Sequence, residues 1–402
     1  MSLIFIFFIC DKKPGRGRSF FTIEVCFVLL FYANFFYGGL YQNNAGLFAG
    51  TVFFFAFVTL LFINHYVLKN KIRLFPYILP VYFLMGVWTV WTSPKPFVDT
   101  FDVFTQVAQK LASFQNPYSA AFIRTYPGID NHFHYLPFSF IITFPFTALL
   151  GDPRYSIIFF NLLSAIILKI IFDDKIERAH LSILLATFLF LPRSFYMLEH
   201  MYLDPIIFSF FLLFYFFYRR RIYRLSIFFL ALFFSFKQNL FVILPLFILD
   251  KTFRTLIMKH LFVFTAPFLL IIFFLLLNPA SFLLNTFFGM FGAVFYPHAV
   301  RSTPTDTALS FQVFIRQFAS SIKTVYLYGI SSLFLLVAGF KILLLNRSHV
   351  VHKIFLMLFA LGYFMHLSFF NHYYFTALFY FFSLMLQHPP LKKIPKTVSQ
   401  SP

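Results

Sequence analysis

Cysteine is scarce in this chain of 402 residues, and several familiar enzyme motifs are missing. The two cysteines, Cys10 and Cys26, lie near the N-terminus and give neither a disulfide framework nor a metal-ligand spacing. The sequence has no glycine-rich phosphate loop, no HExxH zinc motif, no GxSxG nucleophile motif and no Cys/His metal set. These absences leave no signature of the common soluble enzyme classes.

Charge is also scarce, and acidic charge most of all. Charged residues make up 11% of the chain, with 13 Asp and Glu against 32 Lys and Arg, whereas hydrophobic residues make up 60% and the mean hydropathy is +0.81. Many apolar runs approach the roughly 20 residues that a membrane helix needs. This composition excludes a soluble globular protein. The 71 Phe and 22 Tyr suit lipid-facing surfaces and interfacial belts, although a compositionally biased genome would give the same excess.

The apolar runs predict an all-α fold, a polytopic transmembrane bundle of about 10–12 membrane helices. The segments fall at 19–41, 45–67, 74–93, 136–151, 155–172, 179–194, 204–218, 225–249, 259–278, 323–341, 354–369 and 373–388. We expect one transmembrane domain over 1–388, with two large extracytoplasmic loops at 93–135 and 279–322. Residues 389–402 are typical of a disordered cytoplasmic tail.

Basic residues gather in the short stretches between these segments, which places those stretches in the cytoplasm by the positive-inside rule. They include Lys12 to Arg18 before the first segment, the loops at 69–73, 219–224 and 251–259, and the C-terminal tail. We therefore expect a multi-pass protein of the cytoplasmic membrane of a bacterium or archaeon, with both termini cytoplasmic. Because the basic residues follow this pattern, the net charge of +19 does not indicate nucleic-acid binding.

Simple alternation of the segments fails in two places. Segments 136–151 and 155–172 together must make one net crossing. Segment 225–249 has basic clusters at both ends, so it should enter the membrane and return, as a hairpin with Lys237-Gln238 at its tip. Non-helical backbone at such depth is tolerated only where protein or a wet cavity covers it, so the hairpin itself indicates a site.

Asp99 and Asp102 lie in the first large loop, just after the interfacial pair Trp88 and Trp91. The stretch that follows has mixed polarity and predicts a helix along the membrane surface. Either aspartate could act as a general base there. The alternative is a solvated loop acid or a helix N-cap.

Three further groups of residues are candidates for contacts with a substrate. Glu199 and His200 could orient a sugar hydroxyl or a phosphate, unless Glu199 only pairs with Arg193. A buried lysine costs about 2.5–3.5 kcal/mol at a helix centre, so Lys237 needs a partner: a lipid-linked phosphate, or an acid from another span. His298 and Arg301 in the second loop are further candidates for a phosphate contact.

The order of several short motifs resembles bacterial and archaeal integral-membrane glycosyltransferases of the GT-C superfamily. The nearest group is the polyprenol-phosphate-mannose-dependent mannosyltransferase-like family labelled DUF2029, and the resemblance covers roughly residues 90–320. An acid in the first outside loop is followed by Asn116-Pro117-Tyr118, Tyr135-Leu136-Pro137, Gly151-Asp152-Pro153-Arg154-Tyr155, Pro192-Arg193-Ser194 with Glu199, and Lys237-Gln238. The chain departs from the family pattern at Phe114-Gln115, where a glycine is usual, and at His200, where a small residue is usual.

This resemblance implies a transferase that moves a hexose or pentose, with mannose favoured, from a polyprenyl phosphate to a glycan or lipid acceptor with inversion. It implies Asp99 as the base, with Asp102 as the alternative, and Lys237, Arg301 and His298 as contacts to the donor phosphate. Substrate contacts are expected at Glu199, His200, Asn116, Tyr118 and Gln238. No metal and no bound cofactor are expected, because the lipid-linked sugar is a co-substrate. The alternatives are a transporter or flippase of lipid-linked intermediates, or a non-catalytic component of an envelope assembly complex.

Overall fold

The computed structural model describes residues 75–96, 98–123, 133–176, 178–190, 193–288, 310–318, 324–345, 349–364 and 370–387, with isolated positions between 52 and 68. Segment 19–41, most of 45–67 and the tail at 389–402 lie outside the described residues. Every secondary-structure element in the described part of the chain is a helix, which confirms the all-α prediction.

The helices fall into two length classes. The longer ones are α4 (Phe75–Thr92), α5 (Asp99–Ala112), α6 (Phe138–Leu150), α7 (Tyr155–Phe172), α8 (Arg178–Leu189), α10 (Asp204–Arg219), α11 (Tyr223–Phe234), α19 (Thr324–Leu343), α20 (Val350–Phe364) and α21 (Phe370–Gln387). The shorter ones are α9 (Ser194–Glu199), η1 (Gln238–Ile243), α12 (Leu244–Leu249), α13 (Lys251–Lys259), α14 (Leu261–Thr265), α15 (Phe268–Leu277), α16 (Pro279–Leu283), η2 (Leu284–Phe288) and α18 (Phe311–Phe318).

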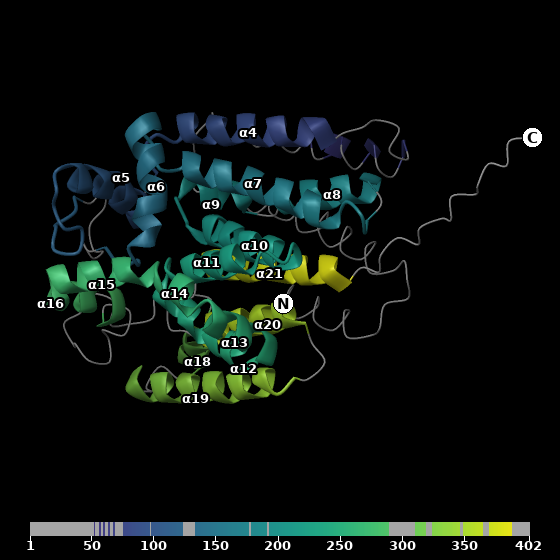
Figure 1. Cartoon of the computed structure of the whole chain (residues 1–402). Coiled ribbons are helices and arrows are strands. Elements are labelled where there is room, and N and C mark those ends of the chain that lie inside the picture. Colours follow the sequence, from purple (N-terminus) through teal and green to yellow (C-terminus); the bar gives the residue numbers. More distant parts are fainter. Residues whose placement is uncertain are drawn as a thin grey trace, which may run out of the picture.

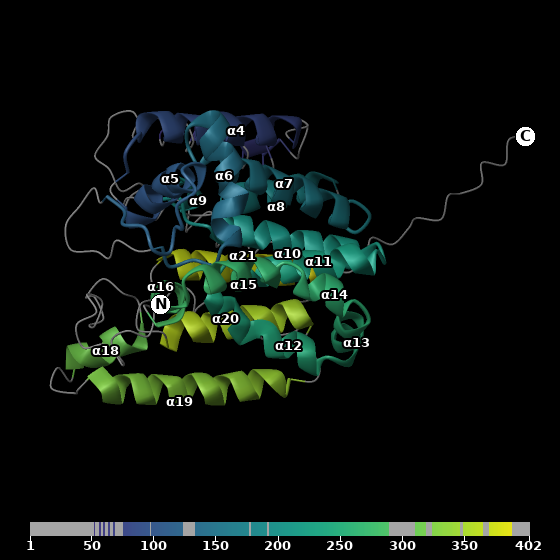
Figure 2. The same cartoon turned by 60° about the vertical axis from the view of Figure 1, so that its left-hand side comes forward.

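Most of the long helices lie side by side with nearly parallel axes, in layers from α4 through α7 and α8, then α10, α11 and α21, to α20 and α19 (Figures 1 and 2). One end of this stack carries α5, α6 and α16, and we call it the site end. The opposite end carries the turn from α10 to α11, and we call it the basic end because residues 219–224 form that turn. The described residues of the predicted outside loop 93–135 thus lie at the end of the stack opposite the predicted cytoplasmic loop 219–224.

Helix α6 explains the first failure of alternation. It runs across the site end at a steep angle to α7, and so α7 alone runs the length of the stack (Figures 1 and 2). Gly151 ends α6 with φ of 77°, a left-handed conformation that glycine adopts without steric cost. The chain can therefore reverse within a few residues and begin α7 at Tyr155.

The segment 225–249 is broken where the sequence predicts the tip of a hairpin. Helix α11 ends at Phe234, and η1 begins only at Gln238. The tip is tied to the site end, because the backbone N–H of Leu136 donates to the carbonyl of Phe236 at 3.2 Å. The chain then returns through η1 and α12 toward α13 at the basic end (Figure 2).

One helix in the described residues, α7, is long and apolar enough to cross a membrane by length and composition. Core helices of soluble proteins meet the same criterion. Several other predicted spans form shorter apolar helices, among them α6, α11, α15 and α20. The multi-pass arrangement therefore stays a prediction.

Helix α5 ends in a left-handed conformation at Phe114. Phe114 follows the C-cap residue Ser113 with φ of 55°, and the N–H of Gln115 donates to the carbonyl of Lys110 at 2.8 Å. This is the left-handed position that usually carries glycine after a helix. Here it carries a phenylalanine that is 99% exposed.

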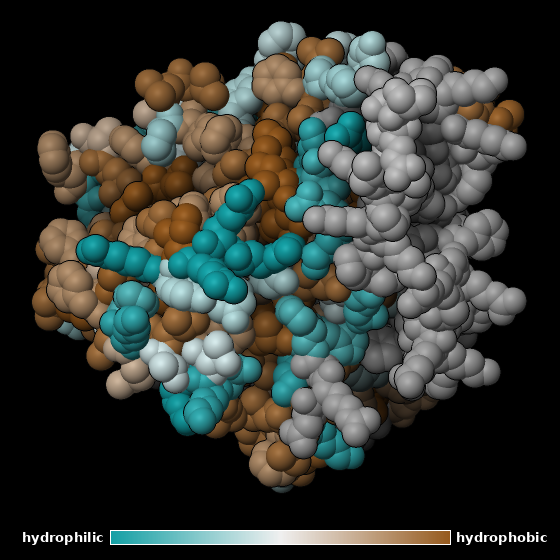
Figure 3. Space-filling view, turned by 45° about the vertical axis from the view of Figure 1, so that its right-hand side comes forward, coloured by the Kyte–Doolittle hydropathy of each residue, from teal (hydrophilic) through white to brown (hydrophobic). Residues whose placement is uncertain are grey.

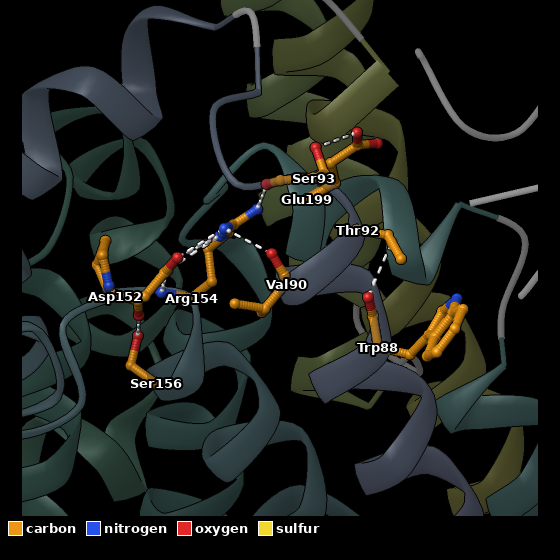
Figure 4. Close-up of polar contacts among 9 residues, drawn as sticks. Trp88, Val90, Thr92, Ser93, Asp152, Arg154, Ser156 and Glu199 are labelled. Atoms are coloured by element: carbon orange, nitrogen blue, oxygen red, sulfur yellow. Dashed lines mark hydrogen bonds and ion pairs between the residues drawn. The ribbon is translucent and has the colours of Figure 1, made fainter. Parts of the chain in front are cut away.

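The fully buried guanidinium of Arg154 joins three helices at the site end (Figure 4). Its Nε and Nη2 donate to the two oxygens of Asp152 at 2.9 and 2.6 Å. Its Nη1 and Nη2 also donate to the carbonyls of Ser93 and Val90 in the last turn of α4, at 2.7 and 3.2 Å. The ring of Phe101 on α5 lies 4.6 Å from the guanidinium carbon. Because helix C-termini leave carbonyls without partners, Arg154 satisfies groups that burial would otherwise leave unpaired.

We predict that Arg154→Met lowers the free energy of unfolding by about 3–5 kcal/mol, because it leaves Asp152 and two carbonyls buried without their donor. Arg154→Lys should recover only part of this loss, since an ammonium cannot reproduce the planar fork. The measurement is thermal unfolding in detergent. Arg178→Ala, at an exposed position in the first turn of α8, is the control that should change little. An Arg154→Met protein that melts with the parent would contradict this role.

Candidate active site

Asp99 is the first residue of α5 and is partly exposed. Its carboxylate accepts hydrogen bonds from the backbone N–H and the hydroxyl of Thr100, at 2.8 and 3.3 Å. The positive end of the helix dipole favours a negative charge at this position. Asp102 lies one turn further along the same helix and is also partly exposed.

Four side chains around α9 form a stack beside Asp99. The guanidinium of Arg193 lies 5.2 Å from the ring centroid of Tyr196, and the His200 ring stacks on Tyr196 at 4.2 Å. Tyr202 continues the stack, 5.9 Å from His200 and nearly parallel to it. Arg193 holds a left-handed backbone with φ of 68°, a costly conformation for a residue other than glycine.

Asp99 is close enough to this stack to act on its charges. Its carboxylate raises the pKa of His200, and it adds to the burial that holds the pKa of Tyr202 well above the usual range. Asp99 therefore acts on the stack electrostatically, and the choice between Asp99 and Asp102 as the base stays a prediction.

His200 is neutral at physiological pH. Its pKa is lowered to about 4, mainly by burial and also by the charges of Arg154 and Arg193, against the opposing effects of the Tyr196 carbonyl and Asp99. Its Nδ1 lies 3.0 Å from that carbonyl, and a carbonyl only accepts, so Nδ1 carries the proton. Nε2 is then an acceptor, suited to a hydroxyl group.

Glu199 faces α4 instead of the stack. It is fully buried, accepts a hydrogen bond from the Ser93 hydroxyl at 2.8 Å, and lies 3.9 Å from Nδ1 of His200 (Figure 4). Since Ser93 is also bound by Arg154, Glu199 extends the contacts that fix the end of α4. These contacts give Glu199 a positioning role, and its contact with a substrate stays a prediction.

Lys237 has an acid as its partner, which is one of the two possibilities that the sequence left open. Its Nζ lies 2.9 Å from Oδ1 of Asp204 at the start of α10, and both side chains are buried. Nζ also lies 5.6 Å from the ring centroid of Tyr135. Tyr135 in turn acts electrostatically on Tyr202, which connects Lys237 with the group that Asp99 influences.

Three predicted substrate contacts make hydrogen bonds within the protein. The Asn116 carboxamide oxygen accepts from the backbone N–H of Tyr118 at 3.0 Å. The Tyr118 hydroxyl donates to the carbonyl of Tyr135 at 2.8 Å, and the side chain is buried. The Gln238 amide donates to the carbonyls of His134 and Thr286, at 3.1 and 2.6 Å. These polar groups hold the site end together, and their contact with a substrate stays a prediction.

His298 and Arg301, the other predicted phosphate contacts, lie outside the described residues. In the part of the chain that the structure describes, no group of three or more His, Cys, Asp or Glu side chains is placed to hold a metal ion. A cavity with room for about one water molecule borders Asp204, Lys237, Asn239 and His372.

The sequence analysis missed Tyr135, Tyr202 and Asp204 as members of the site. The one available signal was the cost of burying Lys237, which required an acid on another helix. Comparison with known proteins adds nothing to these assignments: no protein-family model matches the chain, and no curated protein matches it.

We predict that the stability of this chain falls as the pH is lowered from about 6.5 toward 4. The unfolded chain takes up the His200 proton near its ordinary pKa of about 6.5, whereas the folded chain does so only near 4. The unfolded state therefore binds more protons across this window, and up to about 3 kcal/mol is lost. His200→Gln should remove only part of the pH dependence of the melting temperature, because burial also lowers the pKa of His372 to about 4. A parallel pH dependence in the variant and the parent would contradict the assignment.

We also predict that Lys237→Met and Asp204→Leu each lower the free energy of unfolding by about 3–5 kcal/mol, because each leaves a buried charge without its partner. The double variant should regain most of that loss, since both charges are then gone. The measurement is thermal unfolding of all four proteins in detergent. Additive losses in the double variant would show that the two side chains do not act as a pair.

Proposed function

We propose that this protein is a membrane glycosyltransferase that moves a hexose or pentose from a polyprenyl phosphate to a glycan or lipid acceptor. The observation that supports the proposal is a set of linked interactions: Asp99 acts on His200 and Tyr202, Tyr135 acts on Tyr202, and the Tyr135 ring lies 5.6 Å from Nζ of Lys237. A carboxylate and a cation are the first and last members of this set. Inverting transfer needs both groups: a base for the attacking hydroxyl and a cation for the leaving phosphate.

The proposed reaction assigns one step to each of these two groups. Asp99 takes the proton from the acceptor hydroxyl as the oxygen bonds to the anomeric carbon of the sugar. The bond from that carbon to the phosphate oxygen breaks on the opposite face, and polyprenyl phosphate leaves with the electron pair. A positioned base contributes about 10²–10⁴-fold to such a step. Lys237 stabilises the phosphate charge in a site with little water.

The aromatic stack supplies positioning. Nε2 of the neutral His200 ring can accept a hydrogen bond from a sugar hydroxyl. The Tyr202 ring offers an apolar face of the kind on which sugars stack. The Asp204 carboxylate must share Lys237 with the incoming phosphate, since it lies 2.9 Å from Nζ in the structure. Of the possible sugars, mannose is favoured only by the family resemblance.

Exposed apolar surface on several helices supports the membrane location. Trp91 on α4, Leu276 on α15 and Leu336 on α19 are 69%, 73% and 71% exposed, and each helix carries further exposed hydrophobic side chains. Soluble monomers seldom expose such large apolar areas, whereas lipid covers them without cost. The site end would then face away from the cytoplasm, since the arginines of 219–224 lie at the other end.

The test is sugar transfer by the purified protein in nanodiscs, with labelled polyprenyl-phosphate hexoses and pentoses and a panel of acceptors. We expect Asp99→Asn to lose about 10²–10⁴-fold in rate and Asp102→Asn to retain most of it. Asp102→Asn is the matched control because it makes the same chemical change one turn away on the same helix. Melting temperatures should stay near the wild type for both variants.

Two results would overturn the proposal. One is a wild-type protein that releases no sugar from any donor across the panel, which would favour transport of lipid-linked intermediates or a role as a non-catalytic partner. The other is equal activity of the wild type and Asp99→Asn. Loss of activity in Asp102→Asn alone would support the proposed reaction but would assign the base to Asp102.

A further inference from the structure

A second cavity lies at the basic end, far from the candidate active site. It has a volume of about 370 Å³ and is lined by Tyr218, Tyr223, Lys251, Thr252, Thr255 and Leu256. These residues come from the end of α10, the start of α11 and the short helix α13. The cavity therefore depends on how α13 packs against the turn between α10 and α11.

Aromatic packing and a helix cap fix that arrangement. The ring of Phe253, on the buried face of α13, lies 5.1 Å from that of Tyr218, and the rings of Tyr218 and Tyr223 lie 6.2 Å apart. The Asp250 carboxylate accepts from the backbone N–H groups of Thr252 and Phe253, at 2.9 and 3.1 Å. Asp250 thus serves as the N-cap of α13, and its charge is engaged by the helix terminus.

The surroundings of the cavity are strongly basic. Residues 219–224 contain four arginines, all of them exposed, and residues 250–259 add Lys251, Arg254 and Lys259 against the single acid Asp250. Figure 3, which turns this end of the stack forward, shows a hydrophilic patch with hydrophobic side chains around it. Such a field attracts anions, and the Lys251 ammonium brings a cation into the lining itself.

Exposed apolar side chains continue from the cavity along the same chain segment. Leu249, Met258 and Phe262 are 62%, 64% and 81% exposed. A small soluble anion would have no contact with these groups. A lipid would, because its phosphate could enter the cavity while its acyl chains cover the apolar side chains.

We propose that this cavity binds the phosphate headgroup of an anionic phospholipid from the cytoplasmic leaflet. Lys251 supplies the charge, and the hydroxyls of Tyr218, Tyr223 and Thr252 supply hydrogen-bond donors. The Thr255 hydroxyl already donates to the carbonyl of Lys251 at 2.8 Å and orders this first turn. The proposal requires the membrane location but not sugar transfer, so it can fail while the proposed reaction stands.

The test compares melting temperatures in nanodiscs of phosphatidylglycerol and in nanodiscs of phosphatidylcholine. We expect phosphatidylglycerol to raise the wild-type value by about 2–4 °C, and the double variant Lys251→Ala, Tyr223→Phe to lose most of that shift. Lys341→Ala is the matched control, because Lys341 is an exposed lysine in the last turn of α19 and does not line the cavity. It should keep the full shift.

Equal stabilisation of all three proteins by phosphatidylglycerol would overturn the proposal, since it would show a general effect of surface charge. The same shift from inorganic phosphate added to phosphatidylcholine nanodiscs would also overturn it, in favour of a soluble anion. If the double variant already has a lowered melting temperature in phosphatidylcholine, the single variant Tyr223→Phe tests the proposal instead. Phosphatidylglycerol must then raise the melting temperature of this variant by less than it raises that of the wild type.

Discussion

The buried contact between Arg154 and the last turn of α4 is the constraint on which the site end depends. A guanidinium without solvent is stable only when its donors are all engaged, and here they bind Asp152 and the carbonyls of Val90 and Ser93. This fixes where α4 ends relative to the start of α7. The ring of Phe101 lies against the same guanidinium, so the first turn of α5 and its Asp99 are held at a set place.

Buried charge recurs through the site. Lys237 pairs with Asp204 across two helices, and Glu199 accepts from Ser93. In a chain that is 11% charged, keeping such groups in the interior costs free energy that an apolar core would not. They are retained where several helices begin or end, among them α4, α9 and α10. That concentration is what a site built from several helix termini requires, because helix ends supply both the polar backbone groups and the room for a ligand.

How far the candidate site could be predicted differs from residue to residue. Asp99 was named from its place just after a span, and the structure adds its electrostatic effect on His200. Lys237 was named from the cost of its burial, but its partner Asp204 could not be chosen, because 33 positions separate them and only the packing of α10 against the tip after α11 brings them together. Tyr118 was named as a substrate contact, and nothing local shows that its hydroxyl donates to the carbonyl of Tyr135.

The sequence by itself determined the helical class, the approximate bounds of α7, α10 and α19, and the break before Gln238, because these follow from local apolar runs and from the cost of burying a lysine. Only the tertiary structure decided that α6 lies across the site end and α7 runs the length of the stack, and that Arg154 joins the start of α7 to the end of α4. Local patterns fix which residues avoid water. They do not fix which distant polar groups satisfy one another, because that choice is made only when the helices pack and each buried donor must find an acceptor.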